Sequence, residues 1–415
     1  MAARAQTLAA QLARAADDPI RTLVVGAGVA GMAVAEMLRQ QGWHPVVVDR
    51  ARDDRAPGYM LALMPMVDSL IADLGVRDRY LAESVELSRY RLRDRTGREV
   101  RTDSLAAVVD RYGDYRGISR SSLQEVLSAS GGEVTFETTV AALVEHPEGV
   151  QVRLRTAETE TIHDFDLVIV ADGIRSTTRD LIPGSGPLEK VDTGWGGWVA
   201  WAEPTDDDEP DLGEEIWGAG FLLGTYPVKG AIGAILCGPA EDLAAGPQDF
   251  VRHVRSQLRT SSPRIESALA AVTAEPDPYY WPLDDARTAR WTTAHTVLLG
   301  DAAAGFLPTA GIGAGMAMES AWVLARMLAH APEVGLAALL AEYERVQKPR
   351  VEAAQGNSRE LARLMFRRSR TLAVVRAWVM RAMSVTVALG PIVRLLQNPP
   401  DPERAVAETE VRAAR

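Results

Sequence analysis

The chain has 415 residues, of which 47% are hydrophobic and 24% are charged, and its formal net charge is −11 at pH 7. This length is typical of a globular protein with more than one part, and the negative charge argues against a nucleic-acid-binding surface. The single cysteine, Cys237, excludes an internal disulfide framework and a cysteine-based zinc cluster, and it fits a reducing compartment. The histidines show no metal-ligand spacing, so we expect no metal site.

The two ends of the chain carry no strong targeting signal. There is no run of about 18 apolar residues, so we expect no membrane span. Segment 1–18 lacks an apolar centre, which favours a short helix or a frayed extension of a cytoplasmic protein over a secretion signal. Segment 382–393 is expected to be a packed amphipathic helix, with a membrane-surface position as the weaker alternative. The sequence QNPPDPE, 397–403, predicts the end of ordered packing and a mobile tail after it.

The first recognisable unit is a β-α-β arrangement near the N-terminus. Apolar residues predict strands over 21–25 and 44–49, and the pattern between them predicts a helix over 27–41. The turn that joins the first strand to this helix reads GAGVAG, residues 26–31. In this context the Gly-x-Gly-x-x-Gly spacing is typical of a dinucleotide-binding site.

Each glycine of this turn has its own physical role. Gly26 permits the tight turn, Gly28 lets the backbone approach a pyrophosphate, and Gly31 lets the helix pack closely on the strand. The free N–H groups and the dipole at the start of the helix favour phosphate charge. Asp49, at the end of the second strand, is placed to accept hydrogen bonds from a ribose. The unit therefore predicts binding of the ADP half of NAD or FAD.

The elements that follow alternate between helices and antiparallel strands. We expect two short helices over 70–74 and 78–84, and then a hairpin with a Thr-Gly turn over 91–101. A longer helix over 119–130, a strand meander over 134–163 and a buried strand over 167–170 should follow. Asp172 and Gly173 follow the buried strand directly.

Beyond residue 183 the composition changes, which predicts an inserted domain. Aromatic strands over 195–201, 221–226 and 231–237 alternate with glycine and proline, and helices are expected over 251–258 and 264–271. The acidic stretch TDDDEPDLGEE, 205–215, is expected to be a solvated loop. The predicted fold class is α/β, with a discontinuous Rossmann-type domain, an inserted and mostly antiparallel sheet, and C-terminal helices. The expected boundaries are 1–183 with 295–330, then 184–294, then 331–415, and the hairpin near 85–115 is a candidate to join the inserted sheet.

A second glycine-rich turn favours FAD over NAD. A strand over 296–299 ends in Gly300-Asp301, and the carboxyl end of such a strand is where ligands of open α/β sheets bind. A carboxylate there suits the polyhydroxyl ribityl chain of a flavin. Gly311 and Gly313 leave free N–H groups near the start of the next helix, which suit a flavin's carbonyl edge.

Together these motifs resemble the FAD-dependent monooxygenases of the para-hydroxybenzoate hydroxylase type, from residue 21 to about 324. The resemblance rests on GAGVAG with Asp49-Arg50, on Ser119-Arg120, on ADGIRSTTR at 171–179, and on GDAAAGFLP from Gly300. It implies that Arg120 contacts the ribityl and phosphate region, that Asp172 and Gly173 serve FAD and transient NAD(P)H binding, and that Asp301 binds the ribityl chain. The predicted cofactor-binding residues are Gly26, Gly28, Ala30, Gly31, Asp49, Arg50, Arg120, Asp172, Gly173, Asp301, Gly311, Ile312 and Gly313.

The chain departs from this family at three positions. Ala304 stands where the family often has histidine, and Ile312 and Gly315 stand where it often has glutamine and asparagine. Two alternatives therefore stay open beside a monooxygenase: an FAD-dependent oxidoreductase that inserts no oxygen, and a non-catalytic flavin-binding protein. The tryptophan spacing of GWGGWVAWAEP, 194–204, argues against a halogenase.

The aromatic strands predict an apolar chamber for an aromatic or polycyclic molecule. In a strand Trp195 and Trp201 point one way and Trp198 the other. The candidate substrate residues are Trp195, Trp201, Trp217, Phe221, Tyr226 and Pro308, and no substrate-activating base is identified. The resemblance implies a monomeric or homodimeric enzyme that hydroxylates or epoxidises this molecule with NAD(P)H and dioxygen, through a flavin C4a-hydroperoxide.

Overall fold

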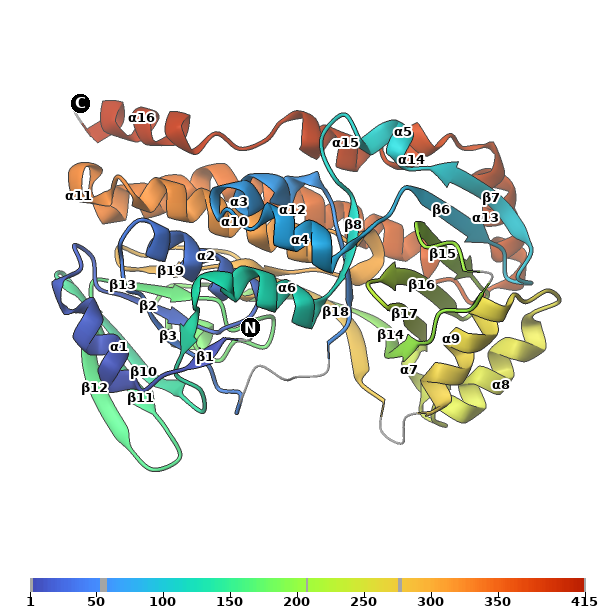
Figure 1. Cartoon of the computed structure of the whole chain (residues 1–415), viewed down its shortest axis with the longest axis horizontal. Helices are drawn as coiled ribbons and strands as arrows, with labels where there is room; N and C mark the ends of the chain where they lie inside the picture. Colours follow the sequence, from blue (N-terminus) through green and yellow to red (C-terminus); the bar gives the residue numbers. More distant parts are fainter. Residues whose placement is uncertain (1–2, 53–57, 207, 275–277, 414–415) are drawn as a thin grey trace.

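The computed structural model of the chain describes residues 3–52, 58–206, 208–274 and 278–413. Two regions, each built around a β-sheet, lie side by side, and helices from the C-terminal part of the chain run along them (Figure 1). Among the described residues, no helix has both the length and the apolar character that crossing a membrane requires.

The first region contains a four-stranded parallel sheet with the strand order β19-β13-β2-β3. The strands are β2 (Thr22–Val25), β3 (Val46–Val48), β13 (Leu167–Val170) and β19 (Thr296–Leu298). All residues of these strands are buried, as expected for a parallel sheet that is covered on both faces. Helices α2 (Val29–Gln40) and α10 (Gly313–Leu328) pack against each other beside the sheet.

The N-terminal segment closes the edge of this sheet. It forms helix α1 (Leu8–Arg14), which makes it a helix and not a frayed extension. The buried Gln11 side chain bonds both backbone polar groups of the edge residue Val47. Its Oε1 accepts from the Val47 N–H at 2.9 Å, and its Nε2 donates to the Val47 carbonyl at 3.0 Å. The side chain shares this edge with the segment at Thr135, whose N–H also donates to the Val47 carbonyl at 2.8 Å.

Replacing Gln11 with alanine should lower the free energy of unfolding by about 1–3 kcal/mol, because the buried N–H of Val47 loses its acceptor, while the Val47 carbonyl keeps only the N–H of Thr135. Urea denaturation followed by circular dichroism measures this change. The control is the same substitution at Gln397, whose side chain is exposed, and it should cost less than about 0.5 kcal/mol. Equal losses in the two variants would contradict the role of Gln11 at the sheet edge.

The second region contains an eight-stranded sheet with the order β20-β18-β14-β17-β16-β15-β6-β7. It is antiparallel except for the pair β15–β6. Five strands come from one stretch of chain, namely β14 (Leu188–Ala202), β15 (Leu212–Trp217), β16 (Leu222–Val228), β17 (Ala231–Pro239) and β18 (Tyr280–Thr288). At one end the hairpin of β6 (Arg89–Arg93) and β7 (Glu99–Ser104) completes the sheet, and at the other end β20 (Ala304–Gly305) does so.

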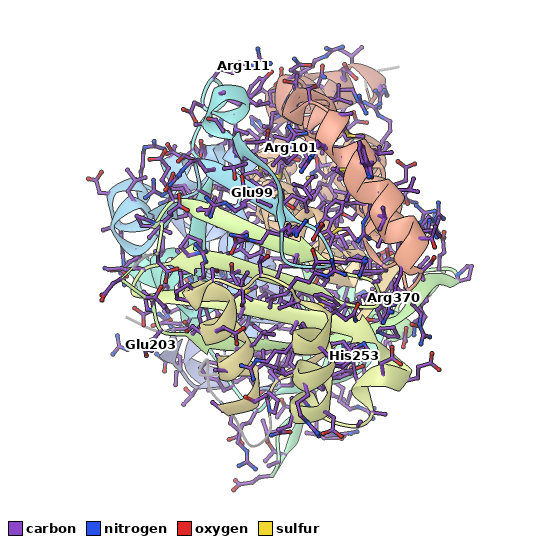
Figure 2. The ribbon with its side chains drawn as sticks, turned by 90° about the vertical axis from the view of Figure 1, so that its right-hand side faces the viewer. Glu99, Arg101, Arg111, Glu203, His253 and Arg370 are labelled. Atoms are coloured by element: carbon purple, nitrogen blue, oxygen red, sulfur yellow. The ribbon has the colours of Figure 1, made fainter. Side chains whose placement is uncertain are left out.

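The two faces of the eight-stranded sheet have different partners. Helices α8 (Pro247–Gln257) and α9 (Pro263–Ala274) cover one face (Figure 2, where His253 lies on α8). The other face packs against Leu307 and against helices α12 (Leu336–Met365) and α13 (Arg370–Ala382). We call this the chamber face, and its buried strand residues are Leu92, Trp195, Val199, Trp217, Leu222, Ile235, Cys237 and Leu283.

The acidic stretch 205–215 is not wholly the solvated loop that its charges predict. From Leu212 onwards it forms β15, in which Glu214 and Glu215 are only 3% and 8% exposed. Donors from distant parts of the chain make this burial possible, since Arg93 Nε on β6 donates to Glu214 Oε1 at 2.7 Å. Tertiary partners therefore override the local charge pattern.

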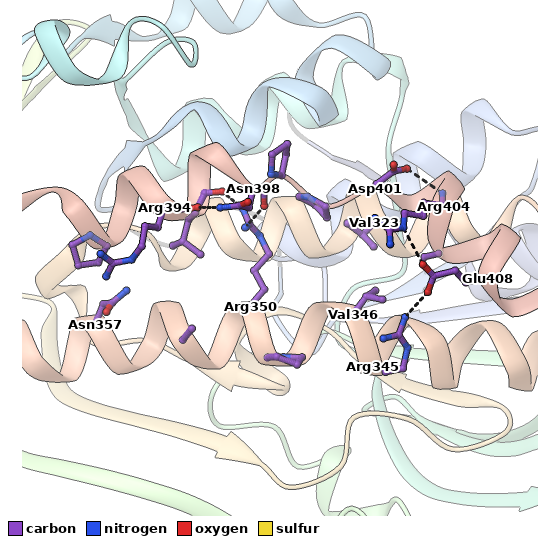
Figure 3. Close-up of a pocket in the computed structure, with 17 residues that line it drawn as sticks. Val323, Arg345, Val346, Arg350, Asn357, Arg394, Asn398, Asp401, Arg404 and Glu408 are labelled. Carbon is purple, nitrogen blue, oxygen red and sulfur yellow. Dashed lines mark hydrogen bonds and ion pairs between the residues drawn. The ribbon is translucent and has the colours of Figure 1, made fainter.

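The C-terminal segment is ordered further than the sequence predicts. Residues 382–393 are not one helix, because α13 ends at Ala382 and is followed by α14 (Val385–Ala388) and α15 (Gly390–Gln397). The prediction of a mobile tail is wrong, since helix α16 (Pro402–Ala413) packs against α10 and α12. A hollow of about 750 Å³ lies between α12, α15 and α16 (Figure 3). Helices α10, α12, α15 and α16 and the link before α16 line it, so it lies apart from the chamber face.

Smaller elements complete the fold. The remaining strands are β1 (Arg4–Ala5), β4 (Met60–Leu63), β5 (Val85–Glu86), β8 (Arg116–Ser119), β9 (Glu133–Val134), β10 (Thr139–His146), β11 (Gly149–Arg155) and β12 (Glu160–Phe165). The remaining α-helices are α3 (Asp68–Asp73), α4 (Arg77–Glu83), α5 (Ala106–Val109), α6 (Arg120–Leu127), α7 (Ala240–Leu243) and α11 (Ala331–Val334). The boundaries of the predicted domains stay a prediction.

Candidate functional site

The two glycine-rich turns meet at one edge of the parallel sheet. Because β2, β3, β13 and β19 run in the same direction, the segments that follow them emerge together at their carboxyl ends. A Cβ added to Gly300 would lie 2.8 Å from the Cβ of Ala30, so the second turn touches the first turn of α2. The fold thus brings Asp49, Asp172 and Asp301 to the same edge of the sheet.

The geometry of the first turn requires glycine at two positions. Gly26 has φ +105°, and a Cβ there would lie 2.4 Å from the carbonyl oxygen of Ala171. A Cβ on Gly31 would lie 1.9 Å from the carbonyl oxygen of Gly26. Gly28 differs, since a Cβ there would meet no protein atom within 4 Å. The backbone at Gly28 is therefore open to a ligand.

Asp49 is fixed to this turn by its own carboxylate. Its Oδ2 accepts from the N–H of Ala27 at 2.6 Å, and its Oδ1 accepts from the N–H of Ala51 at 2.8 Å. Each oxygen retains an acceptor site, because a carboxylate has about four lone-pair positions. The neighbouring Arg50 is exposed.

The Asp172 loop links the first turn to the second. Asp172 Oδ2 accepts from the N–H of Thr178 at 3.4 Å, whereas its buried Oδ1 has no hydrogen-bond partner among the described residues. The buried Arg179 donates to the carbonyl oxygens of Ala302 at 3.0 Å and Ile174 at 3.2 Å, which ties this loop to the Asp301 turn. Gly173 has φ +86°. An unpaired buried acceptor at this place suits a ligand that offers a hydrogen-bond donor.

Asp301 lies just past the carboxyl end of β19, in the turn that follows this strand. Its side chain is exposed to solvent, yet the surrounding protein desolvates the carboxylate and raises its pKa to about 6. Exposure to solvent together with desolvation is what a cleft produces. A ligand that filled the cleft and offered hydroxyl groups would meet the carboxylate there.

Arg120 has a partner that the sequence reasoning missed. Its N–H donates to the carbonyl oxygen of Tyr59 at 2.9 Å, and its guanidinium carbon lies 6.0 Å from the centre of the Tyr59 ring. Burial raises the pKa of Tyr59 to about 12, with Arg120 opposing the rise and Asp301 adding to it. The ring of Tyr59 also lies 5.3 Å from that of Trp281 on β18. A lone tyrosine in a loop gives no motif, so only the fold reveals this cluster.

The segment from Asp301 to the second glycine-rich turn contacts the chamber face through Leu307. Gly311 has φ +62°, Ile312 is buried, and α10 begins at Gly313 without a side-chain cap, which leaves backbone N–H groups free at its start. Pro308 opens a short 3₁₀ helix that is fixed to α12, because the Thr309 hydroxyl donates to the carbonyl of Ser358 at 2.7 Å.

The predicted substrate residues do not all lie together. Trp195 and Trp217 belong to the chamber face, where Trp195 stacks on Phe366 with the ring centres 4.6 Å apart. Tyr226 is on the same face, because it reaches the chamber-face residue Glu215. Trp201 is 38% exposed, and its Nε1 donates to the carbonyl oxygen of Gly58 at 3.1 Å. Phe221 does not join them, since it is fully buried among residues under α8 and α9.

These features fit a flavin dinucleotide. The turn at Gly28 is open where a pyrophosphate would approach, Asp172 holds an unpaired buried acceptor, and the Asp301 turn packs against α10, whose start carries no side-chain cap. In the described part of the chain these devices occupy one sheet edge, next to the apolar chamber face.

Comparisons with known proteins point to the same class. The FAD binding domain family matches residues 20–358. The 3-amino-4-hydroxybenzoate 2-monooxygenase of Streptomyces cremeus is 30% identical over 361 residues, which cover 83% of this chain and 88% of that protein. The FAD-dependent urate hydroxylase of Klebsiella pneumoniae is 26% identical over 394 residues, which cover 90% of this chain and 100% of that protein.

A solved structure has the same fold. Klebsiella pneumoniae HpxO, complexed with FAD and uric acid, superposes with a TM-score of 0.81 at 23% identity, over 92% of this chain and 98% of that chain. Fold and site thus define an FAD-binding flavoprotein with a second, mostly antiparallel sheet. The chain belongs to the FAD-dependent aromatic monooxygenases of the para-hydroxybenzoate hydroxylase type. The predicted fold class, family and FAD cofactor are confirmed.

Proposed function

We propose that the protein is an NAD(P)H-dependent monooxygenase that hydroxylates or epoxidises an apolar, aromatic or polycyclic small molecule. The observation that carries this proposal is the contact between the chamber face and the Asp301 turn. Leu307 from that turn is buried among the chamber-face residues, including Trp195 and Trp217. A ring held on this face would therefore lie beside the cofactor cleft.

In this proposal the protein's residues bind and orient the cofactor. The turn of Gly26, Gly28 and Gly31 and the start of α2 hold the pyrophosphate, Asp49 bonds the ribose, and Asp301 and Arg120 contact the ribityl and phosphate region. The start of α10, at Gly313, offers N–H groups to the flavin ring. When bound, FAD supplies the redox chemistry that accepts electrons from NAD(P)H and activates dioxygen.

The chamber contributes positioning and the exclusion of water. Trp195 and Trp217, both buried on the chamber face, make the lining of this region apolar and aromatic. Pro308 borders this space in the proposal. The sequence contains a single dinucleotide-binding turn, assigned to FAD, so NAD(P)H is expected to bind only transiently.

The purified protein should be yellow, and an aromatic substrate should stimulate its oxidation of NAD(P)H. Mass spectrometry of the product formed under ¹⁸O₂ should show one labelled oxygen atom. A product that lacks the label would favour the alternative, an FAD-dependent oxidoreductase without oxygen insertion. Stimulated NAD(P)H oxidation that yields only hydrogen peroxide would contradict the proposal for that compound. Cytoplasmic location and a monomeric or homodimeric state stay predictions, and light scattering measures the second.

A further inference from the structure

A buried carboxylate lies on the chamber face, in the stretch where the sequence predicts a loop. Glu215, on β15, is 8% exposed. Tyr90 on β6 and the indole Nε1 of Trp217 each donate to its Oε2 at 2.6 Å. The Tyr226 hydroxyl on β16 donates to its Oε1. Three adjacent strands therefore direct polar groups at one carboxylate, in otherwise apolar surroundings.

No described cation forms an ion pair with Glu215. The contrast with its neighbour is clear, because Glu214 on the opposite face pairs with Arg93 at 2.7 Å and with Arg91 at 3.6 Å. Burying a carboxylate without a counter-charge is strongly unfavourable, so a positive charge brought by a ligand would be attracted to this place.

Two arginines on elements around this cluster are bonded to other groups. Arg376 on α13 lies with its guanidinium carbon 5.5 Å from the centre of the Trp217 ring. Its Nη atoms donate to the backbone carbonyls of Leu364, Met365, Trp217 and Gly218. On β7, Arg101 and Asp103 pair with each other at 2.5 Å. In the described part of the chain, neither arginine forms an ion pair with Glu215.

Glu215 also retains an acceptor site. A carboxylate has about four lone-pair positions, and the three donors use two on Oε2 and one on Oε1. Burial, with the charge of Glu215 adding to it, raises the pKa of both Tyr90 and Tyr226 well above the usual range, so these phenols stay neutral donors. Tyr90 and Tyr226 are partly exposed, so solvent reaches the cluster.

We propose that Glu215 is a substrate-binding residue that receives a positively charged N–H group. The substrate class is then an aromatic or polycyclic molecule with a basic nitrogen at the end that contacts β15. A carboxylate at that end would be repelled. This inference rests on the proposed function, because it takes the chamber face as the substrate site.

The test compares three naphthalene probes that differ in one substituent: 2-(aminomethyl)naphthalene, 2-naphthalenemethanol and 2-naphthoate. Isothermal titration calorimetry of the FAD-loaded protein measures each dissociation constant. The amine should bind at least tenfold more tightly than the naphthoate. Equal or tighter binding of the naphthoate, or no measurable binding of the amine, would overturn the proposal.

Two variants localise the effect. Glu215→Gln keeps the shape but removes the charge, and it should reduce the amine-to-naphthoate preference at least tenfold. Glu214→Gln removes a buried carboxylate from the same strand on the opposite face, and it should leave the preference unchanged. An unchanged preference in Glu215→Gln would refute the assignment. Flavin absorbance and the melting temperature show whether each variant is folded. If Glu215→Gln does not fold, the comparison of the amine and the naphthoate on the wild-type protein decides whether the proposal holds.

The binding test is independent of turnover. Calorimetry uses neither NAD(P)H nor the oxygenated product, so the amine preference can hold in a protein that inserts no oxygen. Conversely, ¹⁸O incorporation into a substrate without a basic nitrogen would support the proposed function but not the role of Glu215. The calorimetric comparison of the amine and the naphthoate then decides the role of Glu215.

Discussion

Replacing Gly28 with alanine is expected to leave the flavin-free protein folded while weakening FAD binding at least tenfold, or by about 1.4 kcal/mol. Gly28 has φ −71° and ψ −173°, an extended conformation that alanine adopts freely, and a Cβ there meets no protein atom within 4 Å. The added methyl group instead occupies space that the pyrophosphate needs. The melting temperature of the flavin-free protein and the quenching of FAD fluorescence measure the two effects separately.

Gly31→Ala is the matched control, because its effect should fall on the fold itself. Its Cβ would lie 1.9 Å from the carbonyl oxygen of Gly26 and 3.4 Å from Cγ1 of Val24. We expect a loss of stability of about 1–3 kcal/mol or more from this overlap, even without flavin. A Gly28→Ala variant with unchanged FAD affinity would show that the pyrophosphate does not lie at this turn.

The second prediction concerns Asp301→Asn, which should weaken FAD binding and also change how the flavin-free protein responds to pH. The carboxylate is expected to accept hydrogen bonds from the ribityl chain, and charge-assisted bonds of this kind contribute about 1.5–3 kcal/mol. FAD affinity should therefore fall about tenfold to a hundredfold at pH 8. Equilibrium dialysis with FAD measures it.

The sign of the pH effect follows from the raised pKa. Asp301 has a pKa of about 6 in the folded chain and about 3.9 when unfolded, so the folded state binds more protons between these values. The wild type should lose stability relative to Asp301→Asn as the pH rises from 4 to 6. Solvent exposure of the carboxylate limits this loss to about 1 kcal/mol.

The comparison of wild type and variant isolates Asp301. Asp68, whose pKa burial also raises to about 6, titrates over the same range, but its contribution cancels because both proteins contain it. Chemical denaturation at several pH values measures the difference in the free energy of unfolding. A difference that is constant from pH 4 to pH 8 would show that the folded protein does not desolvate Asp301.

The sequence was sufficient for the parts of the fold whose signals are local. The apolar run before Gly26 and the glycine spacing after it predict a strand, a turn and a helix within a few residues of each other, and the structure places β2 and α2 there. Each glycine's role also follows from its own position. The strand before Asp301 is also predicted from local sequence, because an apolar run followed by Gly-Asp marks a buried strand and its end without reference to residues elsewhere in the chain.

The parts that could not be predicted depend on distant partners. Glu215 sits in a run of acidic residues, and only the pairing of β15 with β6 brings it to Tyr90, about 125 positions earlier in the chain. Helix α16 follows a proline-rich link that normally ends a fold, but Ala405 and Val406 are buried there. Tyr59 meets Arg120 because β4 pairs with β8. In each case, packing between remote segments decides the outcome, and local composition carries no sign of it.

The short strand β20 has a consequence for protein engineering. Backbone pairing of Ala286 with Gly305 and of Arg287 with Ala304 joins the Asp301 turn to strand β18 of the eight-stranded sheet. If only residues 184–294 were exchanged for those of a relative, the grafted β18 would pair with the β20 of this chain and not with its own. Chimaeras that change substrate scope should therefore carry residues 300–310 along with the graft, so that the crossover point falls just before helix α10 and the β18–β20 pairing stays intact.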